Sequence, residues 1–268
     1  MTGERSMLAA RLEDYLSQAE RGEVAVSPFL TPGERKQTER MLCERGMRDA
    51  ARFWGGYPNA ERQSLIVFPD FYVQIPECMP APESDPTEAV SELGGEVIEA
   101  IRIRGSGFRK LTHRDYLGAI LHLGLERDAV GDLAVQNDFE AILFCHQRLT
   151  QFLCENLTRI ANDGVRCEPC LLDERFTDGR VYKPISDTVA SARLDCVVAA
   201  LTNLSREGAQ TAIRAGLVEV DFEEEERIDR ILCPPVTLSV RGHGRYVLRA
   251  FDGETKKGRL RMKADQMV

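Results

Sequence analysis

The sequence predicts an α+β protein with a helical N-terminal part, a middle domain of β-α-β-β-α-β order and a smaller C-terminal domain. A chain of 268 residues is long enough for about two domains, or for three small ones. With 43% hydrophobic and 29% charged residues, its composition is globular. The expected division is a helical part over 1–60, an α+β domain over 61–176, a linker over 177–190 and a C-terminal domain over 191–268. The sequence contains no run of about 18 apolar residues and no signal-peptide core, so we expect a cytoplasmic protein without a membrane contact.

The N-terminal part is predicted to contain two helices. Leu8, Leu12 and Leu16 recur at a helical spacing, and Gly22 ends that run. Thr31 to Glu34 has the spacing of a capping box, which predicts the start of a second helix. Two short runs rich in β-formers follow at 65–68 and 71–75, and the Pro-rich, acidic stretch 77–96 is predicted to be a loop.

Regular alternation of strands and helices begins at Val97. We expect strands and helices, in order, at 97–103 (strand), 113–123 (helix), 132–135 (strand), 140–144 (strand), 147–160 (helix) and 165–172 (strand). This order fits a ferredoxin-like sandwich of the kind that RNA-recognition modules share. Those modules stack bases on exposed aromatic residues of their central strands. Here the first strand has no aromatic residue and the third has Phe144, which could equally be a core residue.

The C-terminal domain is predicted to combine two short helices with a β-hairpin. The helices are expected at 192–202 and from Ser205 to 215, and the strands at 217–221, 236–241 and 245–251. The formal net charge of the whole chain is −8, and a net negative charge argues against nucleic-acid binding. The window 241–263 differs, because it holds eight basic residues and only two acidic ones. We therefore expect any phosphate-binding surface to lie in this domain.

Two local patterns within the domain indicate anion binding. Ser205 is a natural N-cap with Arg206 beside it, which places helix amides and a guanidinium at one end of a helix, although a plain cap would have the same sequence. Two glycines then lie beside Arg241 and Arg245 at a predicted hairpin, and a second basic turn follows at 255–261. Basic residues interleaved with glycines suit a phosphate backbone.

These segments resemble the αL RNA-binding module of the ribosomal protein S-four type. The resemblance is carried by Arg193-Leu194-Asp195, Leu204-Ser205-Arg206, the run 213–221 and the hairpin 239–246. The closing Thr255-Lys256-Lys257-Gly258-Arg259 narrows it to the YlmH family of bacterial RNA-binding proteins. Upstream segments agree, above all His113-Arg114-Asp115-Tyr116-Leu117-Gly118 and Gly131-Asp132.

The resemblance implies an RNA-binding protein of the large ribosomal subunit. Members of the family are implicated in rescuing stalled subunits that still hold peptidyl-tRNA, and some are encoded among cell-division genes. Structured RNA, namely ribosomal RNA or tRNA, is the implied partner, and a monomer without cofactor or metal is expected. By this resemblance, the residues expected to contact RNA are Arg193, Ser205, Arg206, Gln210, Arg241, Arg245, Lys256, Lys257, Arg259 and Arg261. One departure is the acidic run 223–226, which is expected to repel phosphate.

Three further interpretations fit parts of the sequence. A second basic cluster predicts a secondary contact with RNA or ribosomal protein, and its residues are Arg109, Lys110, His113 and Arg114. An RNA-modifying enzyme is the first alternative function, because Arg193-Leu194-Asp195 is similar to the catalytic segment of pseudouridine synthases. No nucleophile, base and oxyanion set accompanies it, so we predict no enzyme. The second alternative is a protein-interaction adaptor linked to cell division.

The cysteines are predicted to be ordinary thiols. Eight cysteines are scattered through a chain that shows no secretion signal, which favours free thiols over disulfides. Cys167 and Cys170 have the spacing of half a zinc site, but no second pair of this spacing occurs. We therefore interpret both as half-buried cysteines rather than ligands.

Overall fold

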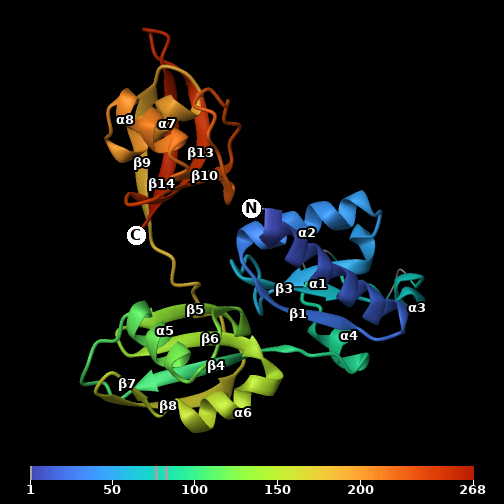
Figure 1. Ribbon diagram of the computed structural model, residues 1–268. Helices are drawn as coiled ribbons and strands as arrows, with labels where there is room; N and C mark the ends of the chain where they lie inside the picture. Colours follow the sequence, from blue (N-terminus) through green and yellow to red (C-terminus); the bar gives the residue numbers. More distant parts are fainter. Residues whose placement is uncertain (1, 76–77, 82–83) are drawn as a thin grey trace. The chain divides into compact units, whose positions relative to one another are not determined.

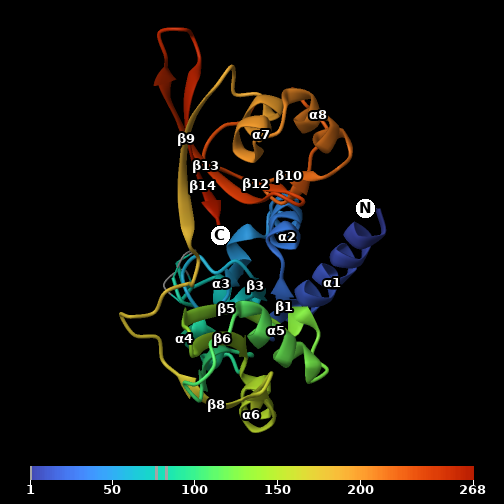
Figure 2. The ribbon, with the colours of Figure 1, turned by 90° about the vertical axis from the view of Figure 1, so that its left-hand side faces the viewer.

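The computed structural model describes residues 2–75, 78–81 and 84–268, and it divides into two compact units, residues 1–179 and 180–268 (Figures 1 and 2). The first unit contains an N-terminal part and a middle domain. The second contains the predicted C-terminal domain. No helix in the described ranges is long and apolar enough to cross a membrane.

The N-terminal part is a three-stranded sheet with helices, and not the purely helical segment predicted for 1–60. Its elements are α1 (Thr2–Glu20), β1 (Ala25–Leu30), α2 (Pro32–Glu44), η1 (Arg48–Ala50), β2 (Ala51–Trp54), β3 (Gln63–Val67), α3 (Asp70–Val73) and α4 (Thr87–Glu92). The strands pair antiparallel in the order β1-β3-β2. Leu12 of α1 and Leu42 of α2 share one core with Leu65 and Val67 of β3.

The prediction was wrong over β1 because a polar residue occupies one of its buried positions. Ser27 is buried between Ala25 and Phe29, so the alternation of β1 is not visible in the sequence. The burial of Ser27 is possible because its hydroxyl accepts a hydrogen bond from the amide of Leu65 at 2.8 Å.

Two other expectations in this part are corrected, and one is confirmed. The β-rich run at 71–75 lies largely in the short helix α3, and the predicted loop at 77–96 contains α4. Residues 76–77 and 82–83 of these segments lie outside the described chain. The capping box at the start of α2 is confirmed, because Thr31 Oγ1 accepts from the amide of Glu34 while the Glu34 carboxylate accepts from the amide of Thr31 at 2.8 Å.

The middle domain has the predicted element order. Its elements are β4 (Ile98–Gly105), α5 (His113–His122), η2 (Arg127–Ala129), β5 (Val130–Asn137), β6 (Glu140–His146), α6 (Gln147–Asn156), β7 (Arg159–Ile160) and β8 (Asp163–Cys170). The strands form an antiparallel sheet in the order β5-β6-β4-β8-β7. On one face of this sheet, Tyr116 of α5 and Leu153 of α6 pack against Ile101 and Leu143.

The opposite face of the sheet is covered by the N-terminal part. Phe144 is 0% exposed, and its ring lies 4.8 Å from that of Tyr57 and 5.8 Å from that of Phe176. Asp132 strengthens this contact, since its carboxylate accepts hydrogen bonds from the Tyr57 hydroxyl at 2.7 Å and from the amides of Glu61 and Arg62 at 2.7 and 3.0 Å. Phe144 is therefore a core residue, and the sheet face on which RNA-recognition modules stack bases is occupied by protein.

The second unit is a six-stranded antiparallel sheet with two helices. Its elements are β9 (Tyr182–Val189), α7 (Leu194–Thr202), α8 (Arg206–Arg214), β10 (Val218–Val220), β11 (Glu223–Glu224), β12 (Val236–Val240), β13 (Gly244–Glu254) and β14 (Leu260–Met267). The strand order is β11-β10-β12-β13-β14-β9. Leu194, Val198, Ile213 and Leu238 contribute to the core between helices and sheet.

The predicted linker at 177–190 is wrong over most of its length, because residues 182–189 form β9. This strand pairs with β14 from Tyr182↔Met267 to Val189↔Leu260. Its Pro184 suggested a loop, but β9 is an edge strand, where a residue without an N–H is tolerated.

Candidate nucleic-acid interface

Three of the predicted RNA-contact residues converge on one buried carboxylate at the start of α7. Asp195 is 0% exposed. Its Oδ1 accepts from Nε of Arg193 at 3.1 Å, and its Oδ2 accepts from Nε of Arg206 at 3.0 Å and from Nε2 of Gln210 at 2.8 Å. Burial on its own would raise the pKa of Asp195, but these three donors outweigh it and hold that pKa well below the usual range for aspartate.

Asp195 therefore fixes the direction of two guanidiniums whose outer edges remain exposed. The side chain of Arg206 is 57% exposed and that of Arg193 is 34% exposed. Each guanidinium carries five N–H donors, so donation to Asp195 leaves further donors for a phosphate. From the sequence, Asp195 was assigned to the αL-like segment and its catalytic interpretation was rejected, but its orienting role was not foreseen; the structure makes it the residue that orients this group.

Ser205 caps the second helix. Its hydroxyl accepts a hydrogen bond from the amide of Gly208 at 3.0 Å, which satisfies one of the free donors at the start of α8. A Cβ at position 208 would lie 3.3 Å from this hydroxyl oxygen. Ser205 thus acts as the helix cap that its sequence position allowed. The proton of the Ser205 hydroxyl is still available to an acceptor.

The basic hairpin of β13 and β14 lies beside the Asp195 group. Arg206 and Arg259 line the same surface hollow, of about 280 Å³, next to β9. Arg259 Nε donates to Oγ1 of Thr188 at 3.0 Å, which ties the hairpin to β9. Lys256 and Lys257 are exposed at the tip, and Arg261 is exposed on β14. In Figure 2 this hairpin projects beyond the rest of the sheet.

Arg241 and Arg245 form a separate group at the other end of β13. They line a hollow of about 350 Å³ beside Gly216 and Leu217, where α8 ends. The Arg245 guanidinium lies over the ring of Phe222, at 5.2 Å from its centroid. Since β13 has 11 residues, the two turns that flank it are separated by roughly 30 Å. The predicted contact residues are thus divided into two groups, and do not form one continuous array.

The acidic run 223–226 is partly neutralised within the fold. Glu225 is buried, and its carboxylate accepts from Arg227 Nε at 3.1 Å and from Arg230 Nη1 at 2.7 Å. The hydrogen bonds from Arg227, followed by those from Arg230, lower the pKa of Glu225 to about 2 despite its burial. The negative charge of Glu225 is therefore compensated by two arginines, and it contributes less to the repulsion of phosphate expected from this run.

The predicted secondary contact lies in the first unit, on the loop between β4 and α5 and in the first turn of α5. Arg109, His113 and Arg114 are exposed there, and Lys110 Nζ forms an ion pair with Asp138 at 2.5 Å. Thr112 and Asp115 form the predicted capping box of α5. The loop also presents Phe108, which is 96% exposed and which sequence analysis missed. A signal was available in the sequence, since this aromatic residue lies between Gly107 and two basic residues.

The cysteine pair is not arranged as a metal or redox site. All eight cysteines are free. Cys167 and Cys170 lie on β8 three residues apart and pack into the cores on opposite sides of the middle sheet. Burial raises the pKa of the Cys167 thiol to about 12. Within the described residues, no group of histidine, cysteine and acidic side chains is arranged to hold a metal ion.

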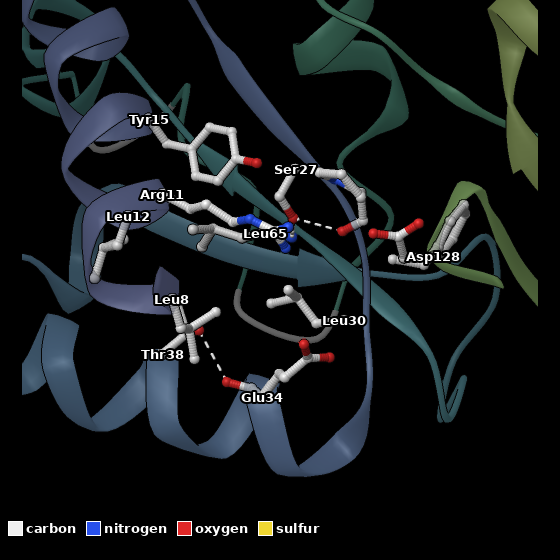
Figure 3. Close-up of a pocket in the computed structure, with 12 residues that line it drawn as sticks. Leu8, Arg11, Leu12, Tyr15, Ser27, Leu30, Glu34, Thr38, Leu65 and Asp128 are labelled. Atoms are coloured by element: carbon white, nitrogen blue, oxygen red, sulfur yellow. Dashed lines mark hydrogen bonds between the residues drawn. The ribbon is translucent and has the colours of Figure 1, made fainter. Parts of the chain in front are cut away.

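One of the cavities in the N-terminal part is too small for a ligand. It has a volume of about 20 Å³ and lies between α1, α2 and β1, where Leu8, Leu12 and Tyr15 line it together with Glu34 (Figure 3). This volume accommodates one water molecule.

Comparison with known proteins covers most of the chain. Residues 4–72 match the family model described as "YlmH, N-terminal", and residues 98–174 match the one described as "Putative RNA-binding domain in YlmH". The chain is 30% identical over 261 residues to the ribosome-associated protein quality control protein P2 of Bacillus subtilis (strain 168), in a match that spans 97% of this chain and 93% of the relative. A solved structure, the cell division protein ylmH from Streptococcus pneumoniae, matches 63% of this chain and 92% of its own with 18% identity and a TM-score of 0.49. The two matched segments and the Bacillus subtilis relative agree, and the chain belongs to the YlmH family.

Proposed function

We propose that this chain binds ribosomal RNA on the large ribosomal subunit and takes part in the quality control of stalled subunits that carry peptidyl-tRNA. The observation that carries the proposal is the convergence of Arg193, Arg206 and Gln210 on the buried Asp195. An anchored guanidinium loses less side-chain entropy on binding a phosphate than a free one does. The name of the Bacillus subtilis relative supports a ribosome-associated role in quality control, and the description of the family model for 98–174 supports RNA binding.

The two basic groups of the second unit suit a backbone that bends or a structured RNA that presents two phosphate rows. The first group comprises Arg193, Ser205, Arg206, Gln210, Lys256, Lys257, Arg259 and Arg261. The second comprises Arg241 and Arg245. The two groups are separated by roughly 30 Å along β13, which is more than one nucleotide can span. This separation favours contact with folded RNA rather than with a mononucleotide.

The burial and hydrogen bonding of Asp195 favour a binding role over that of an RNA-modifying enzyme. A catalytic aspartate must approach its substrate, whereas Asp195 is fully buried and both of its oxygens accept hydrogen bonds from neighbouring side chains. We therefore propose a non-enzymatic binding protein. With the large subunit as its partner, it would act in the cytoplasm, and we propose that it does so as a monomer.

Salt dependence of binding tests the proposal against a protein-interaction adaptor. The full chain would be titrated onto purified large-subunit RNA between 50 and 200 mM salt. Binding through six to eight phosphates predicts a fall in affinity of about 10³-fold across this range, on the scaling for duplex DNA. Apolar protein contacts would change little, so a flat profile would contradict the proposal.

A pair of variants assigns the binding to the second unit. Arg206→Ala together with Lys256→Ala and Lys257→Ala should reduce both the affinity and the salt slope, because the slope falls by about 1 for each phosphate that the protein no longer neutralises. Arg21→Ala, an exposed arginine just after α1, is the control. Arg21→Ala removes one charge and the triple variant removes three, so an equal decrease per removed charge would indicate a nonspecific effect of charge.

A further inference from the structure

Phe108 stands out in the middle domain because a large aromatic side chain is almost completely in water. It is 96% exposed, whereas Phe144 on the sheet is 0% exposed. An exposed ring gains nothing from folding, because water surrounds it in the unfolded chain as well, so burial against a partner remains available to it. A single exposed apolar residue is common on protein surfaces, so the anchoring of the loop and the charges around the ring decide whether Phe108 is a contact residue.

The loop that carries Phe108 is fixed at both ends. On one side, the Gly105 amide donates to the Phe139 carbonyl at 2.8 Å, and the Ser106 amide donates to the Asp163 carboxylate at 3.0 Å. On the other side, the Leu111 amide donates to the Asp138 carbonyl at 2.9 Å, and the Leu111 side chain is buried.

The turn between these anchors holds Phe108 at the tip of the loop. Gly107 has a φ of +89°, a left-handed conformation that glycine adopts without strain. The backbone of the turn is thus anchored on both sides of the ring, so little backbone entropy is left to lose when a partner binds.

The surroundings of the ring are basic. Arg109 and Arg114 are exposed and both lie close enough to Asp115 to lower its pKa, after the larger effect of its hydrogen bonds with Thr112. The two guanidiniums therefore lie near the same helix start, that of α5. Lys110 adds a third cation, although it is paired with Asp138. An exposed ring among cations matches the requirements of a nucleotide, whose base stacks while its phosphates pair with arginine.

We propose that Phe108 stacks on an unpaired base of RNA while Arg109 and Arg114 contact the adjacent phosphates. The inference rests on the proposed function, since it supplies a second RNA contact outside the αL module. It also differs from the mode of RNA-recognition modules, because the stacking residue lies on a loop and the sheet face is covered by the N-terminal part. An unpaired base is required, since a base within a duplex does not expose its face.

Alanine substitution measures the contribution of the ring. Base stacking on an aromatic side chain corresponds to a decrease of roughly 5- to 100-fold in affinity on alanine substitution. We expect Phe108→Ala to weaken binding to a short single-stranded oligoribonucleotide by this factor, and Phe108→Tyr to retain it. Leu171→Ala is the matched control. Leu171 is also a large apolar residue within the segment 98–174, and its side chain is 91% exposed. Unlike Phe108, it has no basic residue next to it in the sequence.

A tryptophan at the same position reports stacking directly. Trp54 is the only tryptophan of the chain and is buried, so Phe108→Trp adds one exposed fluorophore. The single strand should quench its emission, and the same strand annealed to its complement should not. Trp54→Phe in the same chain isolates the signal, and if that variant does not fold, acrylamide quenching separates the exposed fluorophore from the buried one.

The outcomes distinguish this inference from the proposed function. If wild type binds RNA and Phe108→Ala binds equally well, the stacking proposal is wrong and the proposed function stands. If wild type binds no RNA, both fall. If Phe108→Trp emission shifts to the blue with anionic lipid vesicles or a protein partner and is unaffected by RNA, the ring belongs to another interface and the stacking proposal is overturned.

Discussion

Nε of Arg206 lies 3.0 Å from Oδ2 of Asp195, so the first residue of α8 is joined to a fully buried carboxylate in α7. This pair connects the two helices of the candidate interface and keeps the outer edge of the guanidinium in solvent. A carboxylate thus lies at the centre of a surface proposed to bind phosphate. Asp195 holds Arg193 and Arg206 in place through hydrogen bonds. A substitution that removes its charge can show whether this positioning or the charge itself governs RNA binding.

Asp195→Asn is expected to weaken RNA binding although it removes a negative charge. Coulomb attraction alone predicts tighter binding to phosphate after this change. The loss of charge-assisted hydrogen bonds from Arg193 and Arg206 should instead release both guanidiniums and destabilise the second unit by about 1–3 kcal/mol. Binding to large-subunit RNA and urea unfolding would be measured on the same samples.

Glu226→Gln is the control for that substitution. Glu226 is exposed in the same unit, and the change removes one negative charge there as well. Binding should be unchanged or slightly tighter. Tighter binding by Asp195→Asn, at a stability where the protein is fully folded, would show that Asp195 acts only through its charge.

His146 is expected to make the first unit less stable in mild acid. It is buried against the ring of Phe29, with its Nε2 3.3 Å from Oγ of Ser64, and burial lowers its pKa to about 4. An unfolded histidine has a pKa of about 6.5, so the folded state binds the proton less well. The stability from neutral His146 is complete above about pH 6.5 and is lost as the pH falls toward 4, by about 3 kcal/mol in total.

Unfolding in urea between pH 7 and 4.5 tests this dependence. His146→Phe should have a shallower decline of the unfolding free energy than wild type, whatever its stability at pH 7. His122→Gln replaces an exposed histidine and should decline as wild type does. If His146→Phe and wild type declined in parallel, the buried imidazole would not be the cause.

Asp132 and Tyr57 are expected to hold the middle sheet to the N-terminal part. Tyr57→Phe removes the hydrogen bond from the tyrosine hydroxyl to the Asp132 carboxylate and should lower the free energy of unfolding by about 1 kcal/mol. Asp132→Ala leaves the amides of Glu61 and Arg62 without this acceptor, so it should lower the free energy of unfolding by more than Tyr57→Phe does. The two changes are in direct contact, so their effects should not add in the double variant. Full additivity in a thermal or urea unfolding series would contradict the contact.

The fold could be predicted from the sequence where periodicity and caps were visible. The order of elements in the middle domain followed from alternating apolar runs, and the start of α5 followed from the spacing of Thr112 and Asp115. β1 could not be predicted, because the buried position of Ser27 depends on an acceptor role toward Leu65 that only the folded sheet reveals. β9 was missed for a similar reason, since its Pro184 is acceptable only at a sheet edge.

The candidate site was predicted as a set of residue types but not as an arrangement. Arg193, Arg206 and Gln210 were identified by resemblance, while their convergence on Asp195 depends on the angle between α7 and α8. The separation of Arg241 from the Lys256 turn depends on the length of β13, which the sequence underestimated because polar residues fill its outer half. Phe108 was not identified, since exposure of a single aromatic residue is a property of the folded loop.

Sedimentation of the full chain with large ribosomal subunits tests the central claim most directly. Wild type would be compared in sucrose gradients with a variant carrying Arg241→Glu, Arg245→Glu, Lys256→Glu and Lys257→Glu, after both have been shown to unfold at similar urea concentrations. The proposed function predicts that wild type migrates with free large subunits and that the variant stays at the top of the gradient. Wild type remaining at the top even at low salt, or the variant migrating with the subunits as wild type does, would contradict it.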